Sequence, residues 1–176
     1  MQLIEIDKTL YRKRLNIVII SFVGTLLILS LSLGSLMIAL LGDFLIENTA
    51  GQMEVDNFRY NILGVILALL ICVTVLSQIK DKSYFKEIYY VWKLKQLHNR
   101  IYRKFKKIKL AAKNDINALT ILNFYYHSRK QVYLLDDNTL TIPELNKDIK
   151  KLDQMIAKQN LIISLSEFKE SLLKFY

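Results

Sequence analysis

Two uninterrupted apolar runs dominate the pattern of hydrophobic and polar positions along the chain. The first, Leu15 to Gly42, holds 28 residues without a charge, and the second, Ile62 to Ile79, is equally free of charge. As helices they would extend about 42 Å and about 27 Å, against about 30 Å for the hydrocarbon core of a bilayer. The pattern therefore predicts two transmembrane helices, over residues 15–42 and 61–79.

A different pattern follows the second run, over residues 80–113. Apolar residues recur there every three or four positions, which is typical of a helix with a single apolar stripe. The positions of this predicted stripe are Ile88, Val91, Leu94, Leu97 or His98, Ile101, Phe105 and Ile108. Because Leu94, Ile101 and Ile108 lie seven apart, a short coiled-coil seam is also allowed.

The last segment, residues 114–176, carries signals for three further helices. Asp115 is placed to cap a helix that bears Ile116, Leu119, Leu122 and Tyr126 and continues toward Leu135, and Asp136-Asp137-Asn138 predicts a turn. Thr141-Ile-Pro-Glu144 is a capping box with proline in the first turn. The helix that it opens ends near Asn160, and a second capping box, Ser164 to Glu167, predicts a last helix with Phe168, Leu172 and Phe175.

These elements predict an all-α fold, in which a transmembrane helical hairpin is followed by a long basic amphipathic helix and a small cytosolic helical bundle. The scarcity of helix breakers, one proline and five glycines in 176 residues, agrees with this fold class. The predicted parts are a cytosolic N-terminal segment (1–14), the first transmembrane helix (15–42), an acidic periplasmic link (43–60), the second transmembrane helix (61–79), the basic helix (80–113) and the bundle (114–176).

The charges that flank the two runs predict the orientation of the hairpin. Four basic residues precede the first run, a single Arg59 stands in the acidic link, and five lysines follow the second run closely. Because basic residues mark the cytoplasmic side, we expect both termini in the cytoplasm and a multi-pass location in a bacterial inner membrane. The first run is too long for a signal peptide and lacks a clear cleavage site, which favours an uncleaved anchor.

Small residues line one stripe in each predicted transmembrane helix. The helix-packing candidates are Ser32, Ser35, Ala39 and Gly42 in the first helix and Gly64, Ala68 and Cys72 in the second. Small residues at such spacing let helix backbones approach closely within a membrane. Two interpretations stand: the stripes pack on each other within the hairpin, or they form contacts in a homo-oligomer or with a partner.

The basic helix concentrates the positive charge of the chain. Twelve lysines and arginines face only Asp81 and Glu87 over residues 80–113. The candidates for facing lipid are Lys80, Lys82, Lys86, Lys93, Lys95, Arg100, Arg103 and Lys104. Three interpretations compete: a solvated face that sets topology while the apolar stripe packs on later helices, contact with anionic lipid headgroups, and binding of nucleic acid. No recognisable nucleic-acid motif supports the third interpretation.

No pattern in the sequence indicates catalysis, a cofactor or a metal site. His98 and His127 lack a carboxylate or cysteine at ligand spacing, and we expect the first at the edge of the stripe or in solvent and the second partly buried in the bundle. Neither apolar run contains Asp, Glu, Lys, Arg or His, which argues against a transporter. The leading hypothesis is a non-enzymatic membrane protein that presents a basic helical module to a protein partner or to anionic lipid. The alternative is an oligomeric pore-forming or membrane-perturbing effector.

Three stretches of the sequence resemble a known family. They are Asp7-Lys-Thr-Leu-Tyr-Arg-Lys-Arg14, Asn57-Phe-Arg-Tyr-Asn61 followed by Gly64-Val65, and Tyr89-Tyr-Val-Trp-Lys-Leu-Lys-Gln96. The chain resembles, over nearly its whole length, small gammaproteobacterial proteins grouped as a domain of unknown function. The resemblance implies an inner-membrane location and assigns no activity and no functional residues.

Overall fold

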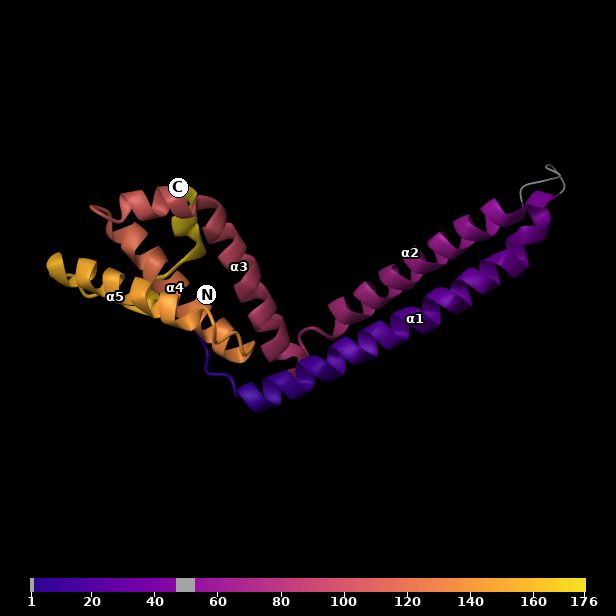
Figure 1. The fold of residues 1–176 in the computed structure, drawn as a ribbon, viewed down its shortest axis with the longest axis horizontal. Helices are drawn as coiled ribbons and strands as arrows, with labels where there is room; N and C mark the ends of the chain where they lie inside the picture. Colours follow the sequence, from indigo (N-terminus) through magenta and orange to yellow (C-terminus); the bar gives the residue numbers. More distant parts are fainter. Residues whose placement is uncertain (1, 47–52) are drawn as a thin grey trace. The chain divides into compact units, whose positions relative to one another are not determined.

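The computed structural model describes residues 2–46 and 53–176, with side chains over 2–41 and 57–176. Its elements are α1 (Lys8–Ile46), α2 (Met53–Ile79), α3 (Ser83–Ala111), α4 (Ile116–Leu135), α5 (Ile142–Lys158) and two short 3-10 helices, η1 (Leu165–Glu167) and η2 (Glu170–Phe175) (Figure 1). The described residues contain no strand, so the all-helical fold class is confirmed. They form two compact units: the hairpin unit, Lys13–Lys86, and the bundle unit, which joins the residues up to Arg12 to Glu87–Tyr176.

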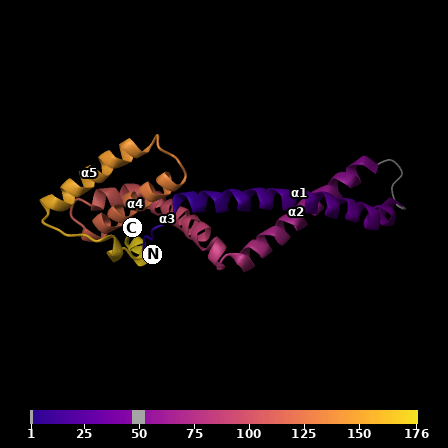
Figure 2. The same cartoon turned by 90° about the horizontal axis from the view of Figure 1, so that it is seen from below.

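In the hairpin unit, the ribbons of α1 and α2 cross in the view of Figure 2, and two glycines lie where the helices come closest. A Cβ atom built on Gly64 would lie 2.6 Å from the backbone nitrogen of Gly34 and 2.8 Å from its Cα atom, so the two backbones meet without side chains between them. The buried face of α2 continues in steps of four through Tyr60, Ala68 and Cys72. The Tyr60 hydroxyl donates a hydrogen bond to the Leu41 carbonyl at 3.1 Å. Small residues thus set the separation of the helices, as in membrane helix pairs.

The bundle unit is built around α4. Residues 118–126 of α4 are all buried, which means that the helix is covered on every side. The apolar stripe of α3 packs there, and five of its positions are buried: Val91, Leu94, Leu97, Ile101 and Ile108. The predicted stripe of α3 is therefore confirmed, whereas α4 is more deeply buried than its own pattern predicted.

Several local predictions in the bundle unit are confirmed. The Asp115 carboxylate accepts a hydrogen bond from the Asn117 amide at 2.8 Å and caps α4, which ends at Leu135 as expected. The turn after α4 contains Asp137 with φ of 56°, and α5 is followed by Asn160 with φ of 53°. Both residue types tolerate the left-handed region better than most, which explains why the helices end at these positions.

Two local predictions are wrong. Thr141 has helical dihedral angles (φ −91°, ψ −9°) and makes no side-chain cap bond, so its capping box does not form. An N-cap side chain reaches the amides ahead of it from an extended backbone, which Thr141 lacks. The second capping box forms at Ser164, but it opens the 3-10 turn η1 instead of an α-helix. The chain becomes extended at Phe168 because that ring is buried against Phe124, with centroids 4.0 Å apart.

The N-terminal residues belong to the bundle unit. Residues 2–7 form an irregular strap, and Asp7 caps α1 through a 2.8 Å bond from the Leu10 amide to its carboxylate. The Tyr90 hydroxyl donates to the Gln2 carbonyl and accepts from the Ile4 amide, at 3.1 and 3.3 Å. These bonds fasten the strap to α3.

Candidate functional site

Three of the eight predicted lipid-facing basic residues are engaged inside the bundle unit. Lys95 pairs with Asp136 at 2.7 Å, and Arg100 pairs with Glu170 at 2.6 Å. The Lys104 ammonium donates a hydrogen bond to the Leu173 carbonyl at 2.6 Å. These contacts join α3 to the turn after α4 and to the C-terminal residues, so all three side chains act within the fold.

The other five predicted residues lie on exposed or junction positions. Lys80 and Lys82 stand between α2 and α3, and Lys86 is exposed in the first turns of α3. Lys93 is exposed with its ammonium 4.7 Å from the centre of the Tyr89 ring, and Arg103 is exposed about three turns further along α3. Of the candidates within the bundle unit, Lys93 and Arg103 are therefore the two that face outward.

Arg103 belongs to an outward surface that the sequence pattern did not single out. Opposite the buried stripe, α3 presents Trp92, Arg103, Lys106, Lys107 and Leu110, which together we call the outer face. The two large apolar side chains are well exposed, Trp92 by 53% and Leu110 by 70%. Within the described part of the chain, no carboxylate pairs with the three basic residues. The outer face therefore combines unpaired positive charge with exposed apolar groups.

A groove lies between α3 and α5, over α4, on one side of the outer face. It has a volume of about 630 Å³. Its apolar lining is Phe105, Leu110, Leu122, Tyr126, Leu152 and Met155, and its charged lining is Lys106, Lys109, Lys113, Lys151 and Asp148. Sequence reasoning missed this groove because it depends on how three helices are placed in the bundle.

The small-residue stripes have different outcomes in the two helices. Gly64, Ala68 and Cys72 lie in the buried face of α2. Ser32, Ser35 and Ala39 are exposed. The interpretation that the two small-residue stripes pack on each other is therefore wrong for these positions of α1. Gly34 provides the close contact instead, because α2 meets the turn of α1 that carries it. The side-chain surroundings of Gly42 lie outside the described residues.

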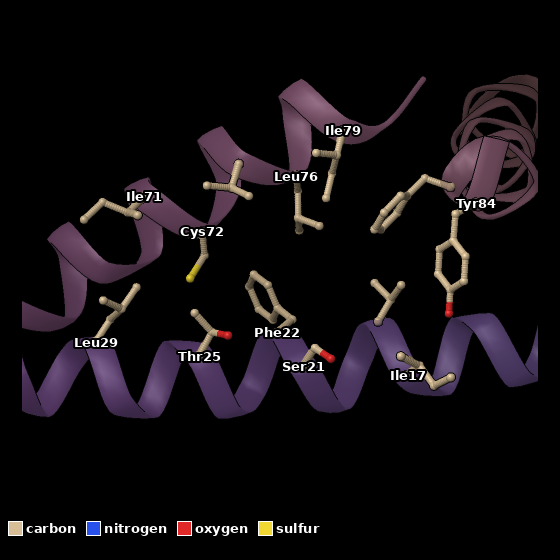
Figure 3. A pocket seen from close by; sticks show the side chains of 13 residues that line it. Ile17, Ser21, Phe22, Thr25, Leu29, Ile71, Cys72, Leu76, Ile79 and Tyr84 are labelled. Carbon is tan, nitrogen blue, oxygen red and sulfur yellow. The ribbon is translucent and has the colours of Figure 1, made fainter. Parts of the chain in front are cut away.

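A narrow apolar crevice opens in the hairpin unit beyond Cys72. Its volume is about 270 Å³, and Figure 3 shows Phe22 from α1 together with Cys72 and Leu76 from α2 pointing into it. The Ser21 and Thr25 hydroxyls are the polar groups of α1 that line it, and Tyr84 lies at one end. The Arg14 guanidinium lies 5.3 Å from the centre of the Tyr84 ring. Most of the residues that line the crevice are apolar, so it suits an apolar occupant.

His98 holds α3 against α4. Its Nε2 atom lies 2.7 Å from the Ser128 hydroxyl, which itself donates to the Tyr125 carbonyl at 3.1 Å. Because the serine proton is used there, the His98 Nε2–H is the donor to the Ser128 oxygen. Burial, and then the nearby Arg129 and Lys95, lowers the pKa of His98 to about 4. His98 thus lies at the edge of the stripe as predicted, and its role is structural.

His127 and the acidic turn after α4 both make contacts within the bundle unit. His127 is partly buried on α4, as expected, and its Nδ1 atom lies 2.9 Å from the Asn123 carbonyl. Asp137 forms ion pairs with Lys8 and with Arg12, the latter at 2.7 Å. Bonding to Lys8 lowers the pKa of Asp137. Sequence reasoning identified the turn but missed its role as the acidic partner of the N-terminal basic residues.

Comparisons with known proteins give a single assignment. The search of curated proteins and the search of solved structures each returned no match. A family model described as "Protein of unknown function (DUF3087)" matches residues 1–173. Two of the helices, over Lys8–Leu41 and Asn57–Ile79, are long and apolar enough to cross a membrane. On the match over residues 1–173, the chain belongs to the DUF3087 family of proteins of unknown function.

Proposed function

We propose that α1 and α2 anchor this protein in the cytoplasmic membrane, where the outer face of α3 binds anionic lipid headgroups. The observation that carries the anchor is the exposure of both helices. Only 6% of the most apolar window of α1 and 17% of that of α2 are buried. The core helix of a soluble protein is covered by its own chain, whereas a membrane helix leaves its apolar surface to lipid.

The chemistry of the outer face supports the lipid ligand. A basic residue near an anionic surface gains about 1 kcal/mol, so Arg103, Lys106 and Lys107 together favour such a surface by roughly 3 kcal/mol. Trp92 and Leu110 are the residue types that insert at the headgroup level of interfacial helices. A solvated face that only sets topology has no need of these two exposed apolar side chains.

An ion pair in the first turns of α1 supports placing both termini in the cytoplasm. Arg12, ahead of the first apolar run, pairs with Asp137, far beyond the second run, inside one compact unit. Both ends of the hairpin must therefore reach the same compartment, which two crossings achieve. The basic residues at both ends favour the cytoplasmic side.

The lipid proposal can be tested with Trp92, the only tryptophan in the chain. The full chain is placed in nanodiscs of neutral phosphatidylcholine or of the same lipid with added phosphatidylglycerol. We expect the Trp92 emission to shift to the blue and to be quenched by spin-labelled lipid only in the anionic discs. Salt should reverse the effect because screening weakens exposed charge interactions.

Two charge variants provide a matched control for this experiment. Lys93→Gln/Arg103→Gln/Lys107→Gln removes two of the three basic residues of the outer face and Lys93 beside it, keeps Lys106 because the groove shares it, and should strongly weaken the response to anionic lipid. Lys109→Gln/Lys113→Gln/Lys151→Gln removes three charges from the groove and should leave the response intact. Equal emission spectra in neutral and anionic discs would overturn the lipid proposal while leaving the anchor untouched.

The anchor and its orientation need a separate test. Membranes from cells that express the chain are washed with alkaline carbonate, and the protein should stay in the pellet. In a Cys72→Ser background, a membrane-impermeant maleimide should label Thr49→Cys from outside intact cells and Gln154→Cys only after lysis. Release by carbonate would overturn the anchor, and the opposite labelling pattern would overturn the orientation.

An oligomeric pore is a second candidate, favoured by one observation. Ser32, Ser35 and Ala39 form a small-residue stripe that remains exposed on α1, where another copy of the helix has room to approach. A potential-sensitive dye tests this candidate at high expression. Depolarisation that Ser35→Leu abolishes would support the pore, and unchanged membrane potential would count against it.

A further inference from the structure

We infer that the groove between α3 and α5 binds an acidic amphipathic helix of a partner protein. The groove lies beside the outer face and shares Lys106 and Leu110 with it, but its other charges are separate from it. This inference does not rest on the proposed binding of lipid.

The floor of the groove suits the apolar side of a helix. Phe105 from α3, Leu122 and Tyr126 from α4, and Leu152 and Met155 from α5 line it. Leu110, 70% exposed at its edge, has no covering side chain from the bundle that would remove it from water. Aromatic, leucine and methionine side chains are those that grooves use to hold amphipathic helices, since methionine adapts to different apolar shapes.

The rim of the groove selects the charge of the partner. Lys106 and Lys109 lie on one edge of α3, Lys113 follows in the turn after that helix, and Lys151 lies on α5. The single acidic lining residue, Asp148, lies 3.7 Å from Lys151, so the four lysines and this aspartate leave the groove a net charge of +3 (4 − 1). The described residues contain no other carboxylate that pairs with these lysines. A basic partner would be repelled, whereas an acidic one gains complementary charges along the groove.

The lysines are spread along the groove, which favours a helix over a single lipid headgroup as its ligand. Lys106 and Lys109 lie about 4.5 Å apart along the axis of α3, and Lys113 continues the row into the turn after the helix. A lipid or fatty-acid headgroup concentrates its charge at one point and would use only part of this row. A helix with acidic residues every three or four positions presents negative charge at the same period as the lysines.

The inference is tested with synthetic peptides and the full chain in neutral nanodiscs. The probe is an amphipathic peptide of about eighteen residues with a leucine stripe flanked by glutamates, labelled for fluorescence anisotropy. One control peptide has lysine in place of glutamate, and a second has the same composition in scrambled order. Only the ordered acidic peptide should bind, and its helical signal in circular dichroism should rise on binding.

The two charge variants of the lipid experiment are used again, with the groove variant now as the test and the outward variant as the control. Lys109→Gln/Lys113→Gln/Lys151→Gln should weaken binding by about tenfold, because three exposed charge pairs are lost. Lys93→Gln/Arg103→Gln/Lys107→Gln should change it by less than about twofold. These lysines and arginines are on the surface, and an unchanged thermal transition will verify that both variants fold.

The outcomes that overturn the inference are distinct from a failure of lipid binding. No binding of the acidic peptide, equal binding of the scrambled peptide, or equal loss in both variants would each overturn it. If the groove variant instead loses the Trp92 response to phosphatidylglycerol, the groove belongs to the membrane surface and the peptide inference is wrong. Loss of that response in the outer variant alone leaves the inference intact.

Discussion

The hairpin unit and the bundle unit bury opposite kinds of residue. In the hairpin unit, backbone meets backbone at Gly34 and Gly64, while large apolar side chains such as Leu31, 72% exposed, point outward. In the bundle unit, large rings fill the interior, as at the stacked pair of Phe124 and Phe168. The contrast agrees with the proposed anchor: water drives large apolar groups into the bundle unit, whereas in lipid close packing would be the force that joins the helices of the hairpin unit.

Each unit contains a probe that occurs once in the chain. Cys72 is buried between the helices of the hairpin unit, and Trp92 is exposed on α3 of the bundle unit. Thiol labelling therefore reports opening of the hairpin, and tryptophan emission reports the state of the bundle. If the contrast between the units is right, a substitution in one unit will move only the probe of that unit.

The largest effect is expected from Phe124→Ala in the bundle unit. Phe124 is fully buried, so the truncation removes a ring and leaves a cavity beside Phe168, at a cost of about 3–5 kcal/mol. Urea unfolding followed by Trp92 emission should show this loss, with the rate of Cys72 labelling unchanged. Phe175→Ala is the control, since Phe175 is 74% exposed. Equal effects of the two substitutions would contradict an aromatic core.

A second large effect is expected from acid, through His98. Its folded-state pKa is about 4, below the ordinary value of 6.5, so the unfolded chain binds the extra proton first. The contribution of neutral His98 to the free energy of unfolding of the bundle unit is therefore full above pH 6.5. This contribution falls by about 2–3 kcal/mol as the pH drops toward 4. Urea unfolding between pH 7 and pH 4.5 measures this slope, again by Trp92 emission.

His98→Gln is the control for the pH experiment. Glutamine keeps an N–H donor for the Ser128 hydroxyl but does not titrate. The variant should lose most of the slope between pH 6.5 and pH 4 while keeping much of its stability at pH 7. A slope that persists unchanged would assign the acid sensitivity to groups other than His98.

Local signals in the sequence predicted much of the bundle unit, and tertiary contacts explain the failures. Asp115 and the apolar stripe of α3 act over one or two turns, so they are visible in the sequence. The full burial of α4 is hidden because it includes polar residues, which usually mark a solvent face. In the structure, Asn123 donates to the Ile163 carbonyl and Thr120 to the Ile116 carbonyl, so their burial leaves these donors satisfied.

The candidate surfaces were less predictable than the helices. The first apolar run holds small residues on several sides, so spacing alone did not distinguish Gly34 from Ser32 and Ser35. The outcome depends on which turn α2 meets, which is a property of the helix pair. Likewise, the basic helix was evident, but only the positions of Asp136 and Glu170 separate its engaged charges from its outward ones.

A graded series of glycine substitutions tests the hairpin unit. Gly64→Ala places a methyl group 2.6 Å from the backbone of Gly34 and should cost about 1–3 kcal/mol, since backbone must move. Gly34→Ala meets the Asn61 side chain at 2.8 Å, which can rotate away, so its cost should be smaller. Gly24→Ala meets nothing within 4 Å and should stabilise α1 by roughly 0.5–1 kcal/mol.

The readout for the glycine series is the rate at which an apolar maleimide labels Cys72. The rate should rise in the order Gly24→Ala, Gly34→Ala, Gly64→Ala, because a wider hairpin exposes the thiol. Trp92 emission should stay constant through the series. Equal rates for all three variants would mean that the helices do not meet at the glycines.

The smallest effect is expected from the ion pairs between the first turns of α1 and the acidic turn after α4. Asp137→Asn removes the charge that pairs with Lys8 and Arg12, and asparagine tolerates the left-handed backbone of this position, so the turn itself should remain. We expect faster hydrogen exchange at the Ile4 amide and no change in the urea midpoint of the bundle. The lowered pKa of Asp137 means that its contribution is present above about pH 4 and is lost only on further acidification. Arg12 belongs to the bundle unit and lies just ahead of the apolar run of α1. If Asp137→Asn strongly changed both Cys72 labelling and Trp92 emission, the two units would be coupled. They would then form one cooperative structure in spite of their different packing.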